Sequence, residues 1–403
     1  MAHTTPPATH PEVDASCEGL PLDGVNVLEL AHFIAGPHAS SILLDHGADV
    51  IKVEPPRGEP GRRTPPLTAD GESLYFATYN RGKRSVALDL RNNANRPILD
   101  ELIRWADIIV TNQSLDVPAR LGYSYEQAST INPAVIMVQI TGFGASSAMA
   151  DYLAFDSIAQ SMSGLASLTG EPDGQPTLSS VFISDHVTGI QAAFAATLAL
   201  QQRNKTGRGT YVEVTMQRAT TGLLGSFVPE ASQAGPAPIR AGNRAPTRFA
   251  NVYPTLDSSI VVSPNTVAMW ESLCEEIGRP EWASSAITDT SRHIFDEDLR
   301  IQTDDAITQW LAQLSGDEAM RRLQARGVPC GKVRTIREVC DDEPTLNFGL
   351  FSQAELLNGT MVDVPGPSFA TTTATNRRSS RVPALGADQQ SVLDDLSAVT
   401  APQ

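Results

Sequence analysis

Short apolar runs alternate with helix-like segments through the first 140 residues, and this alternation constrains the fold more than any other feature. The runs are rich in Val, Ile and Leu at consecutive positions, as in strands buried on both faces. They cover residues 25–30, 49–54, 85–90, 107–112 and 134–140. Helix-like segments lie between most of them, at residues 37–46, 95–105 and 125–130. This alternation predicts an α/β fold whose parallel sheet is covered by helices on both faces.

The turn after the first predicted strand argues against a dinucleotide site. Its sequence is Ala31-His-Phe-Ile-Ala-Gly-Pro-His, which lacks the Gly-x-Gly-x-x-Gly pattern that lets the backbone approach a pyrophosphate. The phosphate-binding pattern Gly-x-x-x-x-Gly-Lys-Ser/Thr is absent from the sequence as well. Chemistry that depends on dinucleotides or ATP is therefore disfavoured.

The charge balance excludes further classes of partner. The chain carries 30 Lys and Arg against 46 Asp and Glu, a net charge of −16, so nucleic acids and anionic membranes are not expected to bind. Residues 51–120 depart from this balance, with 11 basic and 9 acidic residues. A locally basic surface on an acidic protein suits a small polyanionic ligand.

Cysteine and histidine usage predicts a protein without a metal site. The four cysteines and seven histidines show no metal-ligand spacing, and so few cysteines suit a reducing compartment. The first residues form no apolar signal core, and the longest apolar helix-like stretch, residues 190–200, is too short to cross a bilayer. We predict a cytoplasmic protein with no tightly bound cofactor.

The length of 403 residues predicts about two domains. Residues 1–20 are rich in Pro, Thr and His and are predicted to be disordered. The α/β pattern fills residues 21–228. After residue 225 the pattern changes to a loop-like stretch, a hairpin-like stretch at 253–263 and amphipathic helices at 266–277, 302–315 and 317–326. Residues 229–330 are therefore predicted to form a smaller mixed domain with its linkers.

Asp185 carries the strongest local signal for chemistry. It stands in Ser179-Ser-Val-Phe-Ile-Ser-Asp-His-Val-Thr-Gly, between an apolar strand-like run and an Ala-rich helix-like run over residues 187–203. A carboxylate at such a junction either caps the helix by accepting a backbone N–H or is held in place as a reactive group. The local sequence leaves both interpretations open.

Several short segments, taken in order, resemble one known family. They are Leu22-Asp-Gly-Val-Asn-Val-Leu-Glu-Leu, Ala35-Gly-Pro, Gly47-Ala-Asp-Val-Ile-Lys-Val-Glu, Tyr79-Asn-Arg-Gly-Lys-Arg-Ser-Val-Ala-Leu-Asp-Leu, Arg120-Leu-Gly-Tyr, Asn132-Pro, Thr141-Gly-Phe-Gly, Lys205-Thr-Gly-Arg-Gly and Gly327-Val-Pro-Cys-Gly. With this order and spacing the chain resembles the class III coenzyme A transferases, or CaiB/BaiF group, from about Leu20 to its C-terminus. That group includes formyl-CoA transferases and 2-methylacyl-CoA racemases.

The resemblance implies an architecture beyond what the apolar pattern indicates. It implies a Rossmann-like large domain built from both chain ends, residues 21–228 and 331–403, with the smaller domain between them. It also implies an interlocked homodimer, in which two subunits thread through one another.

The resemblance also implies roles for particular residues. Asp185 matches the catalytic aspartate, which attacks an acyl-CoA thioester. Coenzyme A or acyl-CoA, a substrate rather than a cofactor, is expected to bind at His32, Phe33, Ala35, Leu88, Arg91, Asn112, Arg120 and Leu121. Arginine suits phosphate, and leucine suits the faces of adenine. The substrate pocket is expected to contain Ile34, Tyr75, Phe155 and Asp156.

Departures from the family pattern narrow the subtype. Racemases have a histidine before the acidic position that corresponds to Asp156, and this chain has Phe155 there. Formyl-CoA transferases have a glutamine where this chain has Ile34, and a run of four glycines that residues 241–247 lack. Formate and oxalate are therefore disfavoured as substrates, and Arg244 or Arg248 is the expected partner for a second carboxylate of the substrate.

The sequence thus predicts an acyl-CoA:carboxylate CoA-transferase, with succinyl-CoA as the expected donor and a small carboxylic acid as acceptor. Two alternatives stay open. One is a 2-methylacyl-CoA racemase or epimerase, and the other is a non-catalytic CoA-binding paralogue in which Asp185 only caps a helix.

Overall fold

A computed structural model describes residues 19–233, 238–244, 249–283, 297–341, 349–369 and 380–400. The chain divides into two compact units. The large unit contains residues 1–165, 179–226 and 346–403, and the small unit contains residues 166–178 and 227–345. Relative to the predicted boundaries, the small unit thus includes an additional early segment and extends further towards the C-terminus. Most of the predicted disordered segment, residues 1–18, lies outside the described residues.

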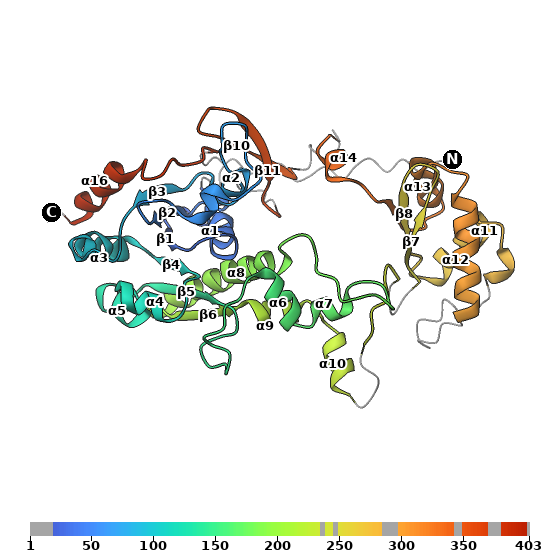
Figure 1. The fold of residues 1–403 in the computed structure, drawn as a ribbon, viewed down its shortest axis with the longest axis horizontal. Coiled ribbons are helices and arrows are strands. Elements are labelled where there is room, and N and C mark those ends of the chain that lie inside the picture. The colour runs from blue at the N-terminus through green and yellow to red at the C-terminus, as the bar shows by residue number, and fades with distance from the viewer. Residues whose placement is uncertain are drawn as a thin grey trace. The chain divides into compact units, whose positions relative to one another are not determined.

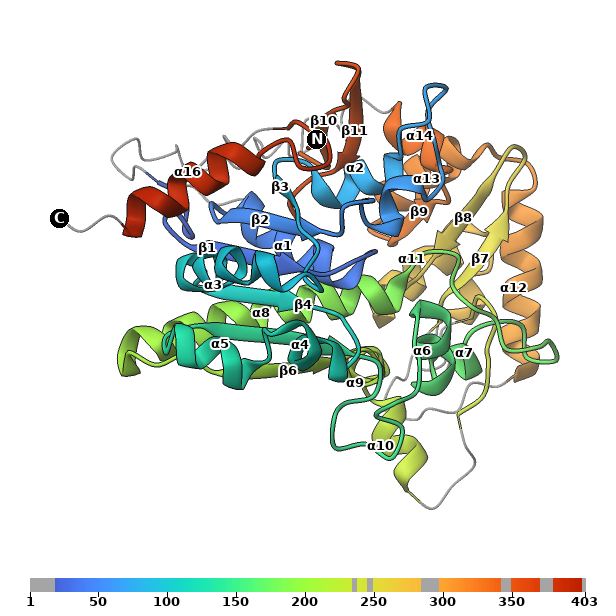
Figure 2. The same ribbon diagram turned by 60° about the vertical axis from the view of Figure 1, so that its left-hand side comes forward.

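A six-stranded parallel sheet forms the centre of the large unit, in the order β3-β2-β1-β4-β5-β6 (Figures 1 and 2). Its strands are β1 (Asn26–Leu30), β2 (Asp49–Glu54), β3 (Arg84–Ala87), β4 (Ile108–Thr111), β5 (Ile136–Thr141) and β6 (Tyr211–Thr215). The predicted parallel sheet is confirmed. The strand order reverses between β1 and β4, and open α/β sheets bind ligands beyond the carboxyl ends of their strands at such a point.

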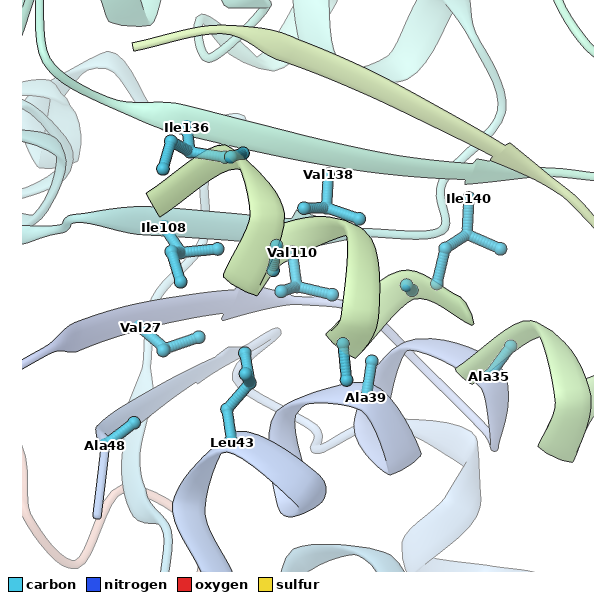
Figure 3. Packing of buried hydrophobic residues seen from close by; sticks show 14 of the residues in the cluster. Val27, Ala35, Ala39, Leu43, Ala48, Ile108, Val110, Ile136, Val138 and Ile140 are labelled. Carbon is cyan, nitrogen blue, oxygen red and sulfur yellow. The ribbon is translucent and has the colours of Figure 1, made fainter. Parts of the chain in front are cut away.

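Two hydrophobic cores cover the two faces of this sheet, because side chains alternate along each strand. On one face, Val27, Ile108, Val110 and Val138 pack against α1 (Ala35–Asp45) and the long helix α8 (Ile183–Thr206), as Figure 3 shows. On the other face, Leu28 and its neighbours pack against α3 (Arg96–Trp105), α5 (Tyr125–Ile131) and α16 (Gln389–Thr400). The C-terminal helix therefore completes the large unit's core.

The remaining elements of the large unit lie around this sandwich. They are η1 (Pro60–Arg63), α2 (Leu74–Asn80), η2 (Asn93–Asn95), α4 (Asp116–Leu121), α6 (Asp156–Met162), α9 (Met216–Gly222), β10 (Phe351–Glu355) and β11 (Met361–Pro365). The hairpin of β10 and β11 packs its buried residues against Phe76 and Ala77 of α2. No helix among the described residues is long and apolar enough to cross a bilayer.

The small unit has its own core. Its antiparallel sheet contains β7 (Asn251–Pro254), β8 (Ser259–Val262) and β9 (Cys330–Lys332). Its helices are α10 (Phe227–Ser232), α11 (Val267–Glu276), η3 (Pro280–Trp282), α12 (Glu297–Leu311), α13 (Gly316–Ala325) and α14 (Ile336–Cys340), while α7 (Leu165–Leu168) begins at the boundary between the units. Fully buried Trp270 and Leu273 of α11 belong to the core that joins sheet and helices.

Two predicted strands differ from the observed structure. The strand expected before Asp185 does not form, and helix α8 begins at Ile183 instead, four residues earlier than the helix-like run. The third strand ends at Ala87 rather than at residue 90. There the N–H of Leu88 still donates to the carbonyl of Glu54, after which Asp89 accepts from the N–H of Arg91 and turns the chain.

Candidate active site

Asp185 is the third residue of helix α8, inside its first turn. Phe182 occupies the N-cap position and has no side chain able to accept a hydrogen bond. The carboxylate of Asp156, from the start of α6, takes over this role. Its Oδ1 accepts the backbone N–H of Ser184 at 2.7 Å and of Asp185 at 3.3 Å. The interpretation of Asp185 as the cap of its own helix is therefore wrong, because a carboxylate 29 residues earlier satisfies these donors.

The capping carboxylate is itself firmly held. Asp156 is 6% exposed, and its Oδ2 accepts from Nε2 of Gln160 at 2.6 Å. Oε1 of Gln160 in turn accepts the N–H of Ser179 at 2.8 Å. Gln160 was not among the predicted site residues, although its position four residues after Asp156 places both on one face of a helix. Together the two side chains connect α6 to the segment that leads into α8.

Asp185 is left with an unusual environment for a carboxylate. Among the described residues its side-chain oxygens accept no hydrogen bond and form no ion pair. Burial, and secondly the negative charge of Asp156, raise its pKa to about 7. A partly buried carboxyl without a compensating partner costs stability, and such groups concentrate at functional sites.

Two tyrosines of α2 lie beside Asp185. Burial and then the charge of Asp185 raise the pKa of Tyr79 to about 12, and the same two causes raise the pKa of Tyr75. Their rings meet edge to face at 5.4 Å, and the ring of Tyr75 also meets that of Phe182 at 6.4 Å. The structure thus places the predicted residue Tyr75 next to Asp185 and adds Tyr79.

A histidine next to Asp185 fixes the orientation of Tyr79. Nδ1 of His186 lies 2.7 Å from the carbonyl oxygen of Phe182, so this nitrogen must carry the proton. Nε2 is then free to accept the hydroxyl of Tyr79, at 3.0 Å. The ring of His38 packs against His186 at 5.1 Å, and burial together with the neighbouring His186 lowers the pKa of His38 to about 4. The hydroxyl of Tyr79 therefore donates to Nε2 of His186.

Removing the charge of Asp156 is expected to shift the titration of Asp185. In Asp156→Asn the amide oxygen still accepts from the start of α8, but the like charge is gone, so the pKa of Asp185 falls. Any reaction of the Asp185 carboxylate will then persist to lower pH, measured as the pH midpoint of its covalent labelling. The weaker cap is expected to cost about 1 kcal/mol of unfolding free energy. As a control, Asp151→Asn removes the same charge from an exposed position and should leave the midpoint unchanged. An unchanged midpoint in Asp156→Asn as well would contradict the conclusion that the charge of Asp156 raises the pKa of Asp185.

The loop after β1 is held at the point where the strand order reverses. The side chain of Asn112 accepts the N–H of His32 at 2.9 Å and donates to its carbonyl at 2.7 Å. Nε2 of Gln113 lies 2.5 Å from Nε2 of His32. Phe33 has a φ of 63°, a left-handed conformation that is costly for an aromatic residue. Oε2 of Glu59 accepts its N–H at 3.0 Å and stabilises this conformation.

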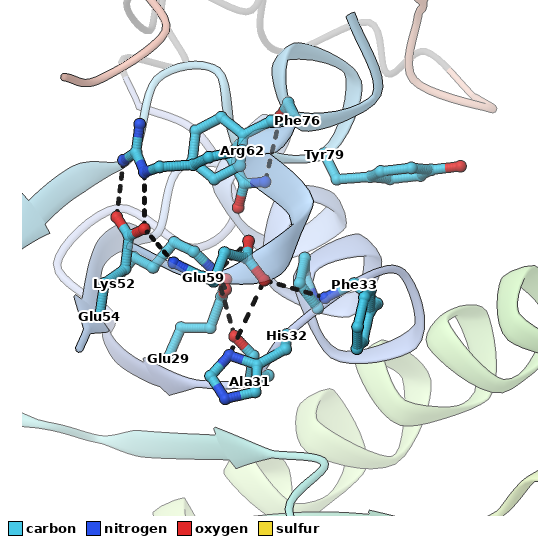
Figure 4. A network of polar contacts seen from close by, with 12 residues as sticks. Glu29, Ala31, His32, Phe33, Lys52, Glu54, Glu59, Arg62, Phe76 and Tyr79 are labelled. Atoms are coloured by element: carbon cyan, nitrogen blue, oxygen red, sulfur yellow. Dashed lines mark hydrogen bonds and ion pairs between the residues drawn. The ribbon is translucent and has the colours of Figure 1, made fainter. Parts of the chain in front are cut away.

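Glu59 belongs to a network of buried charges beneath this loop (Figure 4). Nζ of Lys52 lies 2.5 Å from Glu29 and 3.0 Å from Glu59, and it donates to the carbonyl of Ala31 at 3.0 Å. Lys83 binds the other oxygen of Glu29 at 2.6 Å. Burial alone would raise the pKa of Glu29, but the two lysines outweigh it and hold that pKa at about 2. The network thus fixes the backbone on both sides of His32.

A cavity of about 980 Å³ lies beyond the carboxyl ends of β1 to β4. Five predicted CoA-binding residues line it, namely His32, Leu88, Arg91, Arg120 and Leu121. Three do not: Phe33 contacts the ring of Phe155 edge to face at 5.8 Å, Asn112 binds the backbone of His32, and Ala35 is buried in the core. Polar residues that were not predicted also line the cavity, including Arg96, Gln113 and Gln127.

The remaining predicted pocket residues have different surroundings. Ile34 is 1% exposed and precedes α1, whereas Phe155 is 61% exposed. Arg244, in the small unit, forms an ion pair with Asp304 at 2.8 Å, and Arg248 lies outside the described residues. No group of three His, Cys, Asp or Glu that could hold a metal occurs in the part of the chain that the structure describes.

Comparison with known proteins identifies the family. The family model for CoA-transferase family III matches residues 22–389. The chain belongs to this family. A CaiB/BaiF family protein from Brucella suis superposes with a TM-score of 0.83 at 29% identity, over 94% of this chain and all of that one. The family III assignment confirms the predicted resemblance and makes the protein a class III CoA-transferase, an enzyme that moves CoA between an acyl-CoA and a carboxylate.

Named members of family III extend the comparison. Succinate–glutarate CoA-transferase from Agrobacterium fabrum is 32% identical and aligns over 94% of this chain and 96% of its own. Acetyl-CoA:oxalate CoA-transferase from Acetobacter aceti is 34% identical over 86% of this chain and 90% of its own. Succinyl-CoA–D-citramalate CoA-transferase from Chloroflexus aurantiacus is 33% identical over 80% of each chain.

Proposed function

We propose that Asp185 is the nucleophile that carries CoA from an acyl-CoA donor to a carboxylic acid acceptor. One observation carries this proposal: the Asp185 carboxylate is partly buried beside Asp156, Tyr75 and Tyr79, and no described residue binds its oxygens. A carboxylate stripped of water and of hydrogen bonds is a stronger nucleophile than a solvated one. A structural carboxylate in a protein interior would instead have its partners.

The proposed reaction has two halves. A carboxylate oxygen of Asp185 attacks the thioester carbonyl of the donor, and the C–S bond breaks to give a mixed anhydride and CoA thiolate. The thiolate attacks the aspartyl carbonyl, which releases the donor's acid and leaves an aspartyl-CoA thioester. The acceptor carboxylate then runs the same steps in reverse order and regenerates Asp185. No atom changes its oxidation state and no proton is taken up or released overall. The residues therefore need only bind the substrates, exclude water and stabilise charge.

One of the two tyrosines suits the charge that develops during these steps. Raised pKa values keep the hydroxyls of both Tyr75 and Tyr79 protonated. Because the hydroxyl of Tyr79 already donates to Nε2 of His186, the hydroxyl of Tyr75 is the one able to donate to an oxyanion on the reacting carbonyl. The raised pKa of Asp185 means that only its deprotonated fraction attacks, so loading is expected to decline as the pH falls through about 7.

Intact-protein mass spectrometry tests the proposal. The enzyme is incubated with acetyl-, glutaryl-, oxalyl- and succinyl-CoA, treated with hydroxylamine and mapped by peptide. We expect a hydroxamate at Asp185 with succinyl-CoA, the donor that we propose, and none in Asp185→Ala. Binding of CoA without an adduct from any donor would contradict the proposal. Solvent deuterium entering the α-carbon without an acceptor acid would instead support an epimerase, for which Phe155 supplies no base.

We also propose that two copies of the chain associate. Helix α8 exposes Ile190, Phe194 and Leu198 at 48, 58 and 54%, one turn apart along the helix. An apolar stripe of this kind is typical of a surface that another protein covers. Light scattering should give twice the 43.1 kDa of one chain, and a stable monomer at micromolar concentration would contradict the dimer.

A further inference from the structure

Three arginines line the cavity beyond the sheet, and they differ in how enclosed they are. The side chains of Arg91 and Arg120 are 79 and 67% exposed, whereas that of Arg96 is 37% exposed. A guanidinium that is less exposed keeps more of its attraction for an anion, because less water screens it. Arg96 is therefore the strongest candidate of the three to bind a phosphate.

The guanidinium of Arg96 is held by one edge only. Its Nε donates to Oδ1 of Asp100, one turn later on α3, at 2.7 Å. Among the described residues, Nη1 and Nη2 form no hydrogen bond. These two nitrogens are the half of the guanidinium fork that binds the oxygens of a phosphate in a bidentate pair.

Gly122 makes room for this guanidinium in the wall of the cavity. A Cβ atom at residue 122 would lie 1.6 Å from Nη1 of Arg96. Gly122 also ends helix α4 with a φ of 88°, and it lines the same cavity as Arg96. The absence of a side chain thus allows the guanidinium to lie directly against the backbone between α3 and α4.

We propose that Arg96 binds a phosphate group of the CoA nucleotide and that Asp100 is its positioning residue. This inference rests on the proposed function, since it takes the cavity as the CoA site. Leu88 and Leu121 line the cavity as the apolar partners for adenine, and Arg96 supplies a fixed fork within the same space. The shared chemistry is a phosphate monoester or diphosphate, and two ligands distinguish these: CoA and 3′-dephospho-CoA.

Isothermal titration of the full-length protein tests the assignment. Arg96→Gln is expected to weaken CoA binding by about tenfold or more, the usual effect of losing a charge-assisted pair. Arg104→Gln is the matched control: Arg104 lies on the same helix and pairs with Glu101, but it does not line the cavity, so affinity should not change. Asp100→Asn keeps an acceptor for Nε and removes the competing charge. It should tighten binding by about two- to fivefold.

The two ligands and two variants give separate outcomes. A loss confined to CoA in Arg96→Gln assigns the 3′-phosphate, and an equal loss for 3′-dephospho-CoA assigns the diphosphate; both support the role of Arg96. Unchanged affinity for both ligands in a folded Arg96→Gln protein overturns it. Failure of the wild-type protein to bind CoA would contradict the proposed function itself. In Arg96→Gln, covalent labelling of Asp185 at saturating donor should be retained, which would show that the substitution affects binding and not the reaction.

Discussion

Asp185→Asn is expected to lower the rate of CoA transfer by at least about a thousandfold, because a neutral amide cannot form the anhydride on which both halves of the reaction depend. The dissociation constant for acyl-CoA should change little, because the cavity that we assign to the nucleotide does not include residue 185. Single-turnover measurements at saturating donor separate the two quantities. A loss that appeared only in affinity would contradict the assignment.

The same substitution is expected to stabilise the protein. Because the folded pKa of about 7 exceeds the ordinary value of 3.8, the folded chain binds the proton more tightly than the unfolded chain. The free energy of unfolding therefore falls as the pH rises from about 4 to about 7, and this penalty stays constant above that range. After allowance for partial exposure, Asp185→Asn should gain about 1–2 kcal/mol at pH 8 and almost nothing near pH 4.

Stability and activity thus change in opposite directions if Asp185 is a nucleophile. Losing a helix cap costs about 0.5–2 kcal/mol, so a structural Asp185 would destabilise the protein when replaced. Urea denaturation of wild type and Asp185→Asn at pH 5 and pH 8 provides the comparison. A less stable variant at pH 8 would favour the structural role.

Lys52→Met is expected to produce the largest loss of stability. Lys52 is fully buried between Glu29 and Glu59, and removing it leaves two carboxylates without their shared partner. Breaking a buried pair in this way costs about 3–5 kcal/mol. Chemical denaturation should show the midpoint shift, with Arg104→Met as the control, because its pair with Glu101 is exposed and is worth less than about 1 kcal/mol.

A second substitution distinguishes uncompensated charge from lost packing. Lys52→Met with Glu59→Gln restores the charge balance and should recover part of the loss, whereas no recovery would mean that the loss comes from the packing of the lysine side chain.

Denaturation in acid gives an independent check. The pKa of Glu29 is held at about 2, so its contribution is complete above its ordinary value of 4.5 and disappears as the pH falls towards 2. The single variant should therefore approach wild type in strong acid.

The fold was largely accessible from the sequence because its signals are local. The apolar run at 49–54 is the strand Asp49–Glu54, and the predicted helix at 95–105 is observed as Arg96–Trp105. Both elements are predicted by residues close together in the sequence. Consecutive Val and Ile indicate the buried strand, and amphipathic spacing with an early proline indicates the helix. The short helix α2, which carries Tyr75 and Tyr79, has no such pattern and was not predicted.

The error at residues 179–183 had a different origin. An apolar run before a helix reads as a strand, but here Ile183 begins the helix, since the donors at its start are satisfied by Asp156. This contact joins residues 28 positions apart, and such a contact cannot be predicted from the periodicity of the sequence. Arg96 was missed for a related reason: on a helix surface an arginine is usually solvated, and only the absence of a side chain at Gly122 places it in the cavity wall.

Because Asp156 of α6 caps helix α8, the environment of Asp185 depends on tertiary structure. Until Asp156 docks on the N–H groups of Ser184 and Asp185, residue 185 is an ordinary carboxyl in water, with neither burial nor a neighbouring charge to alter it. With Asp185 as the nucleophile that we propose, a nascent or partly unfolded chain would not be acylated by acyl-CoA. Acylation of Asp185 would then occur only in chains whose tertiary structure is complete.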